Sequence, residues 1–470
     1  MGLGGLLSAS SRRARFWATA AALVIVQALF ILYSRRHDYF FLDDFLDFIV
    51  ARTSGLNFAY LTHDVFGQFA PGFRLLDYLF IQIVGLHYVG VRLLDIVLIG
   101  ATSVLILALA RAWRAPLTLV AAIFAFLPFS PIFSVTLQWM SAAVHVLDGM
   151  TLGVAALVCL CPPRAIGPRR RILGLALWAV GLMFYAKLLF LPVLLVGVRM
   201  SIALEAGEST PIAIRSTWRD LWLFIPTGIV YLAIVKLGHY GSGLPPKGLA
   251  PVLAFIRLGF TDGFASNLLG LNPARHGMRF LACLLLLLPV IVSAVRRPAT
   301  LLVWAGFFLQ FALGMIAIAW SRVTLFGPES ATGSRYHAET AAFYLICVLV
   351  TLVARPGREV EEGAAMRQQI GYTIAMAIAA WLVTASLQAP LLYQPDDGQV
   401  ASYITNFKTS LKTCSSGKIA NTTVPDWLMP NWMKPLNTTH YLAMLFHSDA
   451  CVIDAPSAPH IDPTGRIAAR

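Results

Sequence analysis

Residues 16–48 read FWATAAALVIVQALFILYSRRHDYFFLDDFLDF, and their order indicates how the rest of the chain is built. Residues 16–33 are mostly apolar and have about the length of one membrane-crossing helix, which needs roughly 20 residues. Three carboxylates, Asp43, Asp44 and Asp47, follow about ten residues beyond its end. We therefore expect these acids at a membrane surface, where the chain leaves its first span.

The composition of the whole chain also indicates a membrane protein. Of its 470 residues, 58% are hydrophobic and 13% are charged, and the mean hydropathy is +0.72, which excludes an ordinary soluble domain. The apolar runs predict an all-α polytopic protein with about eleven transmembrane helices. The predicted spans are residues 16–33, 88–110, 117–135, 142–161, 172–186, 188–204, 220–238, 280–295, 300–320, 338–354 and 370–388. Residues 172–204 also fit a single long, kinked span.

Arginines collect in every second short loop, and this pattern predicts the orientation of the chain. They are Arg12, Arg13, Arg15, Arg111, Arg114, Arg164, Arg169, Arg170, Arg171, Arg215, Arg219, Arg296, Arg297, Arg355, Arg358 and Arg367. Because cytoplasmic loops retain Lys and Arg, we expect these loops and the N-terminus in the cytoplasm. Arg35 and Arg36 are an exception, which Asp38 and the following aspartates offset. The net charge of +13 is then explained by the arginines of the cytoplasmic loops, which set the membrane orientation, and does not indicate nucleic-acid binding.

The tail, residues 389–470, is predicted to be a small extracytoplasmic domain that follows a membrane module of residues 1–388. Cys414 and Cys451 lie in this tail, where an oxidising compartment would allow a disulfide between them; two free thiols are the alternative. The other four cysteines fall in apolar spans and are expected to be buried core residues: Cys159, Cys161, Cys283 and Cys347. Frequent arginine and alanine suggest a GC-rich bacterium and hence a cytoplasmic membrane.

The predicted outer face carries the long loops, which include residues 34–87, 239–279 and 321–337. The segments FLDDFLDFIVARTSGLNFAYLTHDVF and VLAFIRLGFTDGFASNLLGL place apolar residues at helical spacing, which predicts amphipathic helices lying in the membrane interface. Such helices would frame a cavity at the level of the lipid headgroups. A channel or carrier is expected to place polar residues at mid-membrane instead, and few charges lie there.

This order of elements resembles the GT-C class of integral-membrane glycosyltransferases. The similarity lies in a cytoplasmic N-terminus, one span, an outer loop opening with the pair Asp43 and Asp44, the segment GQFAPGFRLLDYLF at residues 67–80, many spans and an outer C-terminal domain. The resemblance implies an enzyme that takes a sugar from a polyprenyl-phosphate carrier and inverts its anomeric centre. It also implies that an acid of the first outer loop is the general base. Multi-span architecture alone is shared by unrelated proteins, so the acidic pair is the most specific part.

Glycosyl transfer to a hydroxyl requires a carboxylate that accepts the proton of this hydroxyl. Neighbouring residues of a helix point about 100° apart, so Asp43 and Asp44 are expected to have different roles. The sequence slightly favours Asp44 as the base. The alternative is that both acids are merely solvated, or offset Arg35 and Arg36.

Two further pairs of polar residues are candidates for binding the acceptor or the sugar. His63 and Asp64 come later in the first loop, and His145 and Asp148 lie three residues apart, on one face of a predicted helix. These pairs could bind a sugar, or a divalent cation together with Asp43 and Asp44. The alternative is that each pair satisfies its own hydrogen bonds at the interface.

Cations on the outer side are candidates for binding the donor phosphate. They are Lys187, where an apolar hairpin turns, and the group Arg335, Tyr336 and His337 in FGPESATGSRYHAE. Arginine offers a planar fork to phosphate oxygens, and lysine a point charge. Alternatively, such residues reach toward the headgroups of bulk lipid. Weaker candidates of the same kind are Arg257, Arg275 and His276.

The sequence thus predicts an inverting glycosyltransferase on the outer face of a bacterial cytoplasmic membrane. Its expected partners are a polyprenyl-phosphate-linked sugar, an envelope glycan or lipid acceptor and the membrane lipids, and not nucleic acid. No P-loop or dinucleotide-binding motif is present in the sequence, which agrees with a lipid-linked donor. A flippase or exporter of lipid-linked glycans is the competing hypothesis.

Overall fold

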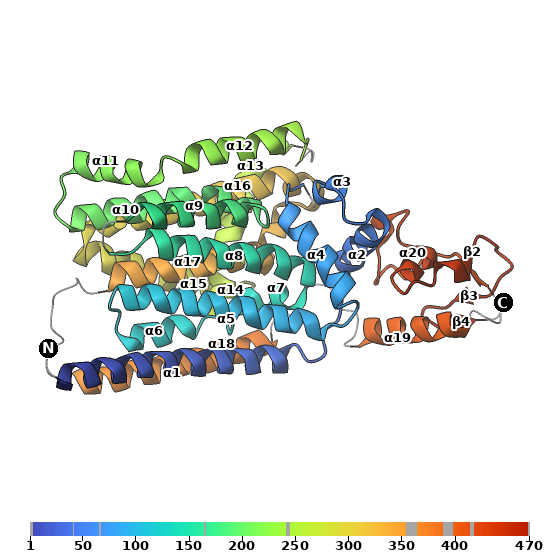
Figure 1. Ribbon diagram of the computed structural model, residues 1–470, viewed down its shortest axis with the longest axis horizontal. Coiled ribbons are helices and arrows are strands. Elements are labelled where there is room, and N and C mark those ends of the chain that lie inside the picture. The colour runs from blue at the N-terminus through green and yellow to red at the C-terminus, as the bar shows by residue number, and fades with distance from the viewer. Residues whose placement is uncertain are drawn as a thin grey trace.

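The computed structural model consists of a long helix bundle with a smaller domain at one end (Figure 1). It describes residues 3–40, 42–64, 67–163, 166–240, 245–353, 364–388, 398–413 and 418–468. Helices dominate, and the four strands have two residues each, so the predicted all-α polytopic fold is confirmed. The end of the bundle that carries the small domain is called the capped end below.

The bundle is built from helices that lie roughly parallel or antiparallel (Figure 1). They are α1 (Leu3–Ser34), α5 (Val89–Ala112), α8 (Met140–Leu160), α9 (Pro168–Leu182), α10 (Leu191–Glu205), α11 (Thr210–Leu221), α12 (Phe224–Leu237), α15 (His276–Arg296), α16 (Leu301–Phe326), α17 (Ala338–Leu352) and α18 (Ala364–Gln388). Among the described residues, eight helical stretches are long and apolar enough to cross a membrane, or nine if the bent pair α11 and α12 is one span. Seven of the eight coincide with predicted spans.

The predicted single span at residues 117–135 is wrong. The chain here forms α6 (Leu117–Phe124), the 3-10 helix η1 (Pro131–Phe133) and α7 (Ser134–Gln138). Pro128 and Pro131 explain the break, because proline has no backbone N–H to continue a helix. The interrupted segment still follows α18, since Thr118 lies against Gly371 and the hydroxyls of Ser134 and Ser386 are 3.0 Å apart.

Two other predicted spans are helices that are shorter than a span. Helices α9 and α17 have 15 residues each, whereas about 20 are needed to cross the hydrocarbon core. In α17 every residue from Ala338 to Thr351 is buried. This helix is therefore enclosed by the other helices of the bundle and has little contact with lipid, so its length need not match the membrane.

The segment predicted as an interfacial helix, residues 252–271, falls largely within a continuous helical run, residues 249–269, that is as long and apolar as a span. The run consists of α13 (Leu249–Leu258), the π-helix η3 (Gly259–Ser266) and α14 (Asn267–Leu269). Just before it, the carbonyl of Pro245 accepts a hydrogen bond of 3.1 Å from Thr324, near the end of α16. At its other end, the carbonyl of Leu269 accepts one of 2.9 Å from Trp381, in the second half of α18. Both ends thus lie toward the capped end, which indicates a re-entrant segment.

Three short helices close the capped end of the bundle (Figure 1). They are α2 (Asp43–Ser54), α3 (Phe58–Leu61) and α4 (Pro71–Ile83), all from the predicted first outer loop. Phe45 and Phe48 of α2 belong to the same buried apolar cluster as Tyr403 and Phe407 of the small domain. The cap and the small domain therefore share one core.

The small domain begins with a helix and continues through short, mostly irregular segments. Its elements are α19 (Gln399–Lys412), β1 (Ile419–Ala420), η8 (Asn431–Met433), α20 (Thr439–Met444), η9 (Asp449–Cys451), β2 (Val452–Ile453), β3 (His460–Ile461) and β4 (Ile467–Ala468). Strands β1 and β2 pair in parallel, and β3 and β4 pair antiparallel. Cys451 is disulfide-bonded. Cys414 lies outside the described residues, so the pairing of these two cysteines stays a prediction.

Candidate active site

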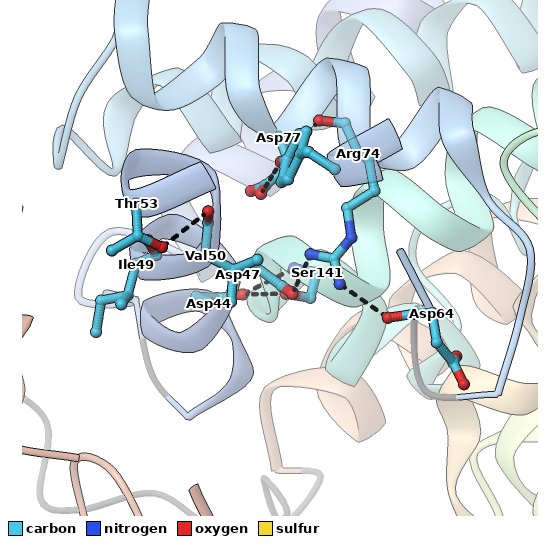
Figure 2. Close-up of polar contacts among 10 residues, drawn as sticks. Asp44, Asp47, Ile49, Val50, Thr53, Asp64, Arg74, Asp77 and Ser141 are labelled. Carbon is cyan, nitrogen blue, oxygen red and sulfur yellow. Dashed lines mark hydrogen bonds and ion pairs between the residues drawn. The ribbon is translucent and has the colours of Figure 1, made fainter. Parts of the chain in front are cut away.

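Helix α2 begins at the acidic residues that open the first loop, and it directs them to different sides. Asp44 is fully buried, and its carboxylate accepts hydrogen bonds from the backbone N–H of Ser141 at 2.8 Å and from its hydroxyl at 2.9 Å. Asp47 is one turn further and accepts from the same hydroxyl at 2.9 Å. Ser141 lies at the start of α8, so both acids fasten α2 to the bundle (Figure 2).

Arg74 of α4 completes this buried network (Figure 2). Its guanidinium forms an ion pair of 2.9 Å with Asp47 and donates to the carbonyl of Asp64 at 3.0 Å. Tyr60 of α3 donates to Asp77 at 3.2 Å in the same region. Burial raises the pKa of Asp47, while the charge of Arg74 opposes this shift. Every charged group of the network thus has a protein partner. The contacts of the network join α2, α3, α4 and α8.

Asp43 instead faces a cavity of 410 Å³ at the capped end of the bundle. The walls come from the start of α2, residues 67–69, the start of α8, the turn at residues 185–190, α12, the second half of α16 and residues 335–336. Among the lining residues are Gln68, Trp139, His145, Lys187, Tyr231, Arg322, Arg335 and Tyr336. Burial, reinforced by the nearby charge of Asp47, raises the pKa of Asp43 to about 7, although Arg335 and Arg322 oppose the shift. This carboxyl can therefore exchange a proton near neutral pH.

Two arginines give the cavity a positive side. Arg335 stacks on the ring of Trp139 at 4.5 Å and donates to the Tyr336 hydroxyl at 3.1 Å. Burial alone would raise the pKa of Tyr336, but the charges of Arg335 and Arg322 outweigh burial and lower it. The sequence prediction included Arg335 and Tyr336 and missed Arg322. The signal was present, because Arg322 lies just beyond the predicted span 300–320, in the same predicted outer loop as Arg335.

Lys187 lies at the same cavity, but its ammonium group is engaged by protein atoms. Its Nζ atom is 2.5 Å from Glu339 Oε1, and it donates to the carbonyl of Tyr336 at 2.7 Å and the hydroxyl of Thr340 at 3.1 Å. The side chains of Lys187 and Glu339 are both buried, at 5% and 1% exposure. This ion pair leaves the charge of Lys187 largely neutralised. Lys187 therefore holds the Tyr336 backbone in place rather than offering a vacant cation.

His337, the last member of the predicted phosphate-binding group, lies behind the cavity wall. It is fully buried, its Nε2 atom is 2.8 Å from the carbonyl of Ala331, and its ring stacks on Phe311 at 6.0 Å. It is not among the residues that line the cavity. His337 thus supports the loop that presents Arg335.

The four residues predicted to bind the acceptor or sugar do not converge. His145 lines the cavity and stacks on Phe73 at 4.3 Å, and its Nε2 atom has no partner among the described residues. Asp148 is half-buried outside the cavity, and His63 is exposed. Asp64 accepts a hydrogen bond of 2.5 Å from the N–H of Gly67 and so shapes the loop beside the cavity. His145 alone of the four contributes directly to the cavity wall.

The remaining candidates lie away from this site. Arg257, Arg275 and His276 are exposed and do not line the cavity. In the part of the chain that the structure describes, no group of three or more His, Cys, Asp and Glu side chains could hold a metal ion. The four cysteines predicted in the spans are free thiols and are buried or half-buried.

The chain matches no known protein-family model, and no curated protein matches it. One solved structure to which the chain is similar is the arabinofuranosyltransferase AftD from Mycobacteria, with 16% sequence identity and a TM-score of 0.43. The match covers 89% of this chain and 31% of the other, so the chain spans about a third of that protein. At this level of likeness the function has to be argued from the site itself.

Proposed function

We propose that the cavity is the active site of a membrane glycosyltransferase that moves a sugar from a polyprenyl-phosphate donor to a hydroxyl of an envelope glycan or lipid. One observation carries this proposal: a carboxyl group with a pKa of about 7, Asp43, lines the same cavity as Arg322 and Arg335. Glycosyl transfer from a phosphate needs both a base for the acceptor and cations for the leaving group.

Asp43 is assigned as the general base. In its ionised form it accepts the proton of the acceptor hydroxyl while the acceptor oxygen bonds to the anomeric carbon of the sugar. The bond from this carbon to the phosphate oxygen breaks at the same time, and the polyprenyl phosphate departs with the electron pair. Attack opposite the leaving group inverts the anomeric centre. A base is most effective when its pKa lies near the working pH, as the pKa of Asp43 does.

Arg335 and Arg322 are assigned to the donor phosphate. A guanidinium group offers two parallel N–H donors to phosphate oxygens and stabilises the charge that develops as the phosphate leaves. Trp139 and Tyr336 hold the plane of Arg335, whose guanidinium carbon lies 4.5 Å and 5.0 Å from the centres of their rings. The arginine is thus oriented before the donor binds, which lowers the entropy that binding costs.

An apolar groove next to the cavity supports a donor with a long hydrocarbon chain. The groove has a volume of 560 Å³, lies between α10 and the pair α11 and α12, and shares Leu189 and Leu232 with the cavity. Ile225 and Ile229 of α12 line it, yet 47% and 60% of their surfaces stay exposed. A polyprenyl chain could lie in this groove while its phosphate reaches the arginines.

Asp44, which the sequence slightly favours as the base, is assigned a positioning role. Its carboxylate accepts two hydrogen bonds from Ser141 and is fully buried. It fixes the start of α2 against α8 and thereby sets where the neighbouring Asp43 points. The arginine pattern of the loops further supports an enzyme whose capped end faces outward from a bacterial cytoplasmic membrane.

The test is a transfer assay with radiolabelled polyprenyl-phosphate sugars and a panel of envelope acceptors. Purified wild type, Asp43→Asn and Glu329→Gln are compared; Glu329 is an exposed carboxylate of the 3-10 helix Pro328–Thr332 and does not line the cavity. We expect transfer by the wild type and by Glu329→Gln, and a rate lower by about 10²–10⁴-fold in Asp43→Asn, although all three fold. If no donor is consumed and the protein in liposomes moves lipid-linked glycans across the bilayer, the function is transport.

A further inference from the structure

A second, basic groove lies where the bundle meets the small domain, and the proposed reaction does not use it. It has a volume of 1040 Å³. One side is formed by residues 36–39 after α1 and residues 86–92, which lead into α5. The other side is formed by α19 and residues 445–448 of the small domain. It is separate from the cavity of Asp43, because the two have no lining residue in common.

The charges of this groove are strongly unbalanced. Four arginines and lysines line it: Arg36, Arg92, Lys408 and Lys412. Among the described lining residues the one acid is Asp38, and it is buried and lies 3.7 Å from Arg35, which is outside the groove. Lys408 and Lys412 are exposed and four residues apart on α19, where like charges repel each other. An anion between the two walls would remove this repulsion.

The arginines of the bundle side are held in place by contacts that leave their charge uncompensated. Arg92 donates to the backbone carbonyls of Arg36 at 3.1 Å and Asp38 at 3.4 Å. Arg36 donates to the carbonyl of Tyr33 at 2.8 Å and stacks over its ring at 4.3 Å. These partners are neutral carbonyls and an aromatic ring. Both guanidinium groups are thus oriented, and neither forms an ion pair with a carboxylate of the described residues.

Apolar helix surfaces that begin at the groove indicate what kind of anion would bind. On α5, Val89 lines the groove, and Leu93 and Val97 continue from it at four-residue spacing, with 56%, 55% and 64% of their surfaces exposed. On α1, Leu29 and Tyr33 lead up to the groove and are 60% and 58% exposed. Both helices are candidate membrane spans, so these surfaces face acyl chains if the bundle is inserted.

We propose that this groove binds the headgroup of an anionic phospholipid, whose acyl chains lie along the exposed surfaces of α1 and α5. The phosphate lies between the arginines at the end of the bundle and the lysines of α19. Because the two walls belong to different parts of the molecule, the lipid bridges them and stabilises the docking of the small domain. This inference does not depend on the proposed transferase reaction, and its test needs no enzymatic activity.

The test uses purified full-length protein in non-ionic detergent and a photoreactive phosphatidylglycerol, with the phosphatidylcholine analogue as the comparison. After illumination, the cross-linked peptides are mapped. We expect phosphatidylglycerol to label residues 36–39, 86–92 or α19, and phosphatidylcholine to label them weakly. In Lys408→Ala/Lys412→Ala the phosphatidylglycerol signal should fall at least roughly tenfold, because both α19 cations that attract the anionic headgroup are removed.

The control variant Lys434→Ala/Arg466→Ala removes two exposed cations of the small domain that do not line the groove. Its labelling should equal that of the wild type. Equal labelling by both lipids, or an unchanged signal in the double lysine variant, would overturn the proposal. Displacement of the lipid by millimolar glycerol phosphate would also overturn it, since the site would then bind a soluble phosphate.

Discussion

The carboxylates on the two sides of helix α2 differ in whether other residues of the chain satisfy their hydrogen bonds. Asp44 and Asp47, on the side toward α8, accept hydrogen bonds from Ser141 and Arg74 and form a closed network. Asp43, on the other side, faces a cavity whose arginines lie near enough to affect its pKa. A buried charge that has a full set of protein partners contributes to structure, whereas one that faces a cavity is available to a substrate.

The same difference separates the two kinds of cation at the cavity. Lys187 is paired with the buried carboxylate of Glu339, and Arg335 is held by the rings of Trp139 and Tyr336. A ring orients a guanidinium group without cancelling its charge. The comparison thus assigns Asp43 and Arg335 to chemistry, and Asp47 and Lys187 to stability.

Substituting Asp43 and Asp47 of α2 one at a time should separate the catalytic role from the structural role most clearly. Asp43→Asn should lower the rate of transfer by about 10²–10⁴-fold, the usual contribution of a general base, and leave the melting temperature unchanged or higher. Asp47→Ala should instead destabilise the protein by about 3–5 kcal/mol, because Arg74 loses its carboxylate partner inside the network. The measurements are transfer kinetics and thermal unfolding in detergent. An Asp47→Ala protein that is as stable as the wild type would contradict the assignment.

Lys187 and Glu339 should behave as a structural pair. Lys187→Met leaves the carboxylate of Glu339 buried without its cation, which should cost about 3–5 kcal/mol of stability. The double variant Lys187→Met/Glu339→Gln should recover a large part of this loss, because no buried charge remains. Thermal unfolding of the wild type, both single variants and the double variant gives the coupling energy. Additive losses would show that the two side chains do not depend on each other.

Arg335→Lys should reduce transfer with little change in stability. The substitution keeps the positive charge but removes the planar fork, so we expect a loss of about 10- to 100-fold, the worth of one hydrogen bond to a charged group. Arg257→Lys is the matched control, since Arg257 is exposed and outside the cavity. An Arg335→Lys enzyme with wild-type kinetics would show that any cation suffices at this position.

The sequence could not predict all of these roles, because contacts between residues far apart in the chain decide some of them. Hydropathy located most helices, because each apolar run is a local signal, and it failed at residues 117–135, where two prolines break a run that is otherwise apolar. Helical spacing predicted that Asp43 and Asp44 differ. It could not tell which one faces the cavity, because that depends on Ser141, 97 residues further along the chain. The pairing of Lys187 with Glu339 joins residues that are still further apart in the chain, and it was missed for the same reason.

The pH dependence of transfer should report the ionisation of Asp43. Since burial raises its pKa to about 7, the group is protonated below that pH and cannot accept the acceptor proton. We expect kcat/KM to fall about tenfold per unit as the pH decreases below 7, and to level off above it. The raised pKa also means that ionised Asp43 opposes folding, so stability should decrease as the pH rises from about 4 to 7 and level off above 7. In Asp43→Asn this part of the decrease should be absent.

The smallest expected effect concerns the apolar groove, which extends the comparison from charges to the lipid chain. Gly228 of α12 lines the groove, and a Cβ atom there would lie 3.5 Å from Leu189 and 3.7 Å from Trp178, which is ordinary contact. Gly228→Leu should therefore fold and fill part of the groove. We expect KM to rise several-fold for donors with long polyprenyl chains and to stay unchanged for short-chain analogues, because only a long chain would occupy this space. An equal change for both donors would place the lipid chain elsewhere and leave the assignments of Asp43 and Arg335 unaffected.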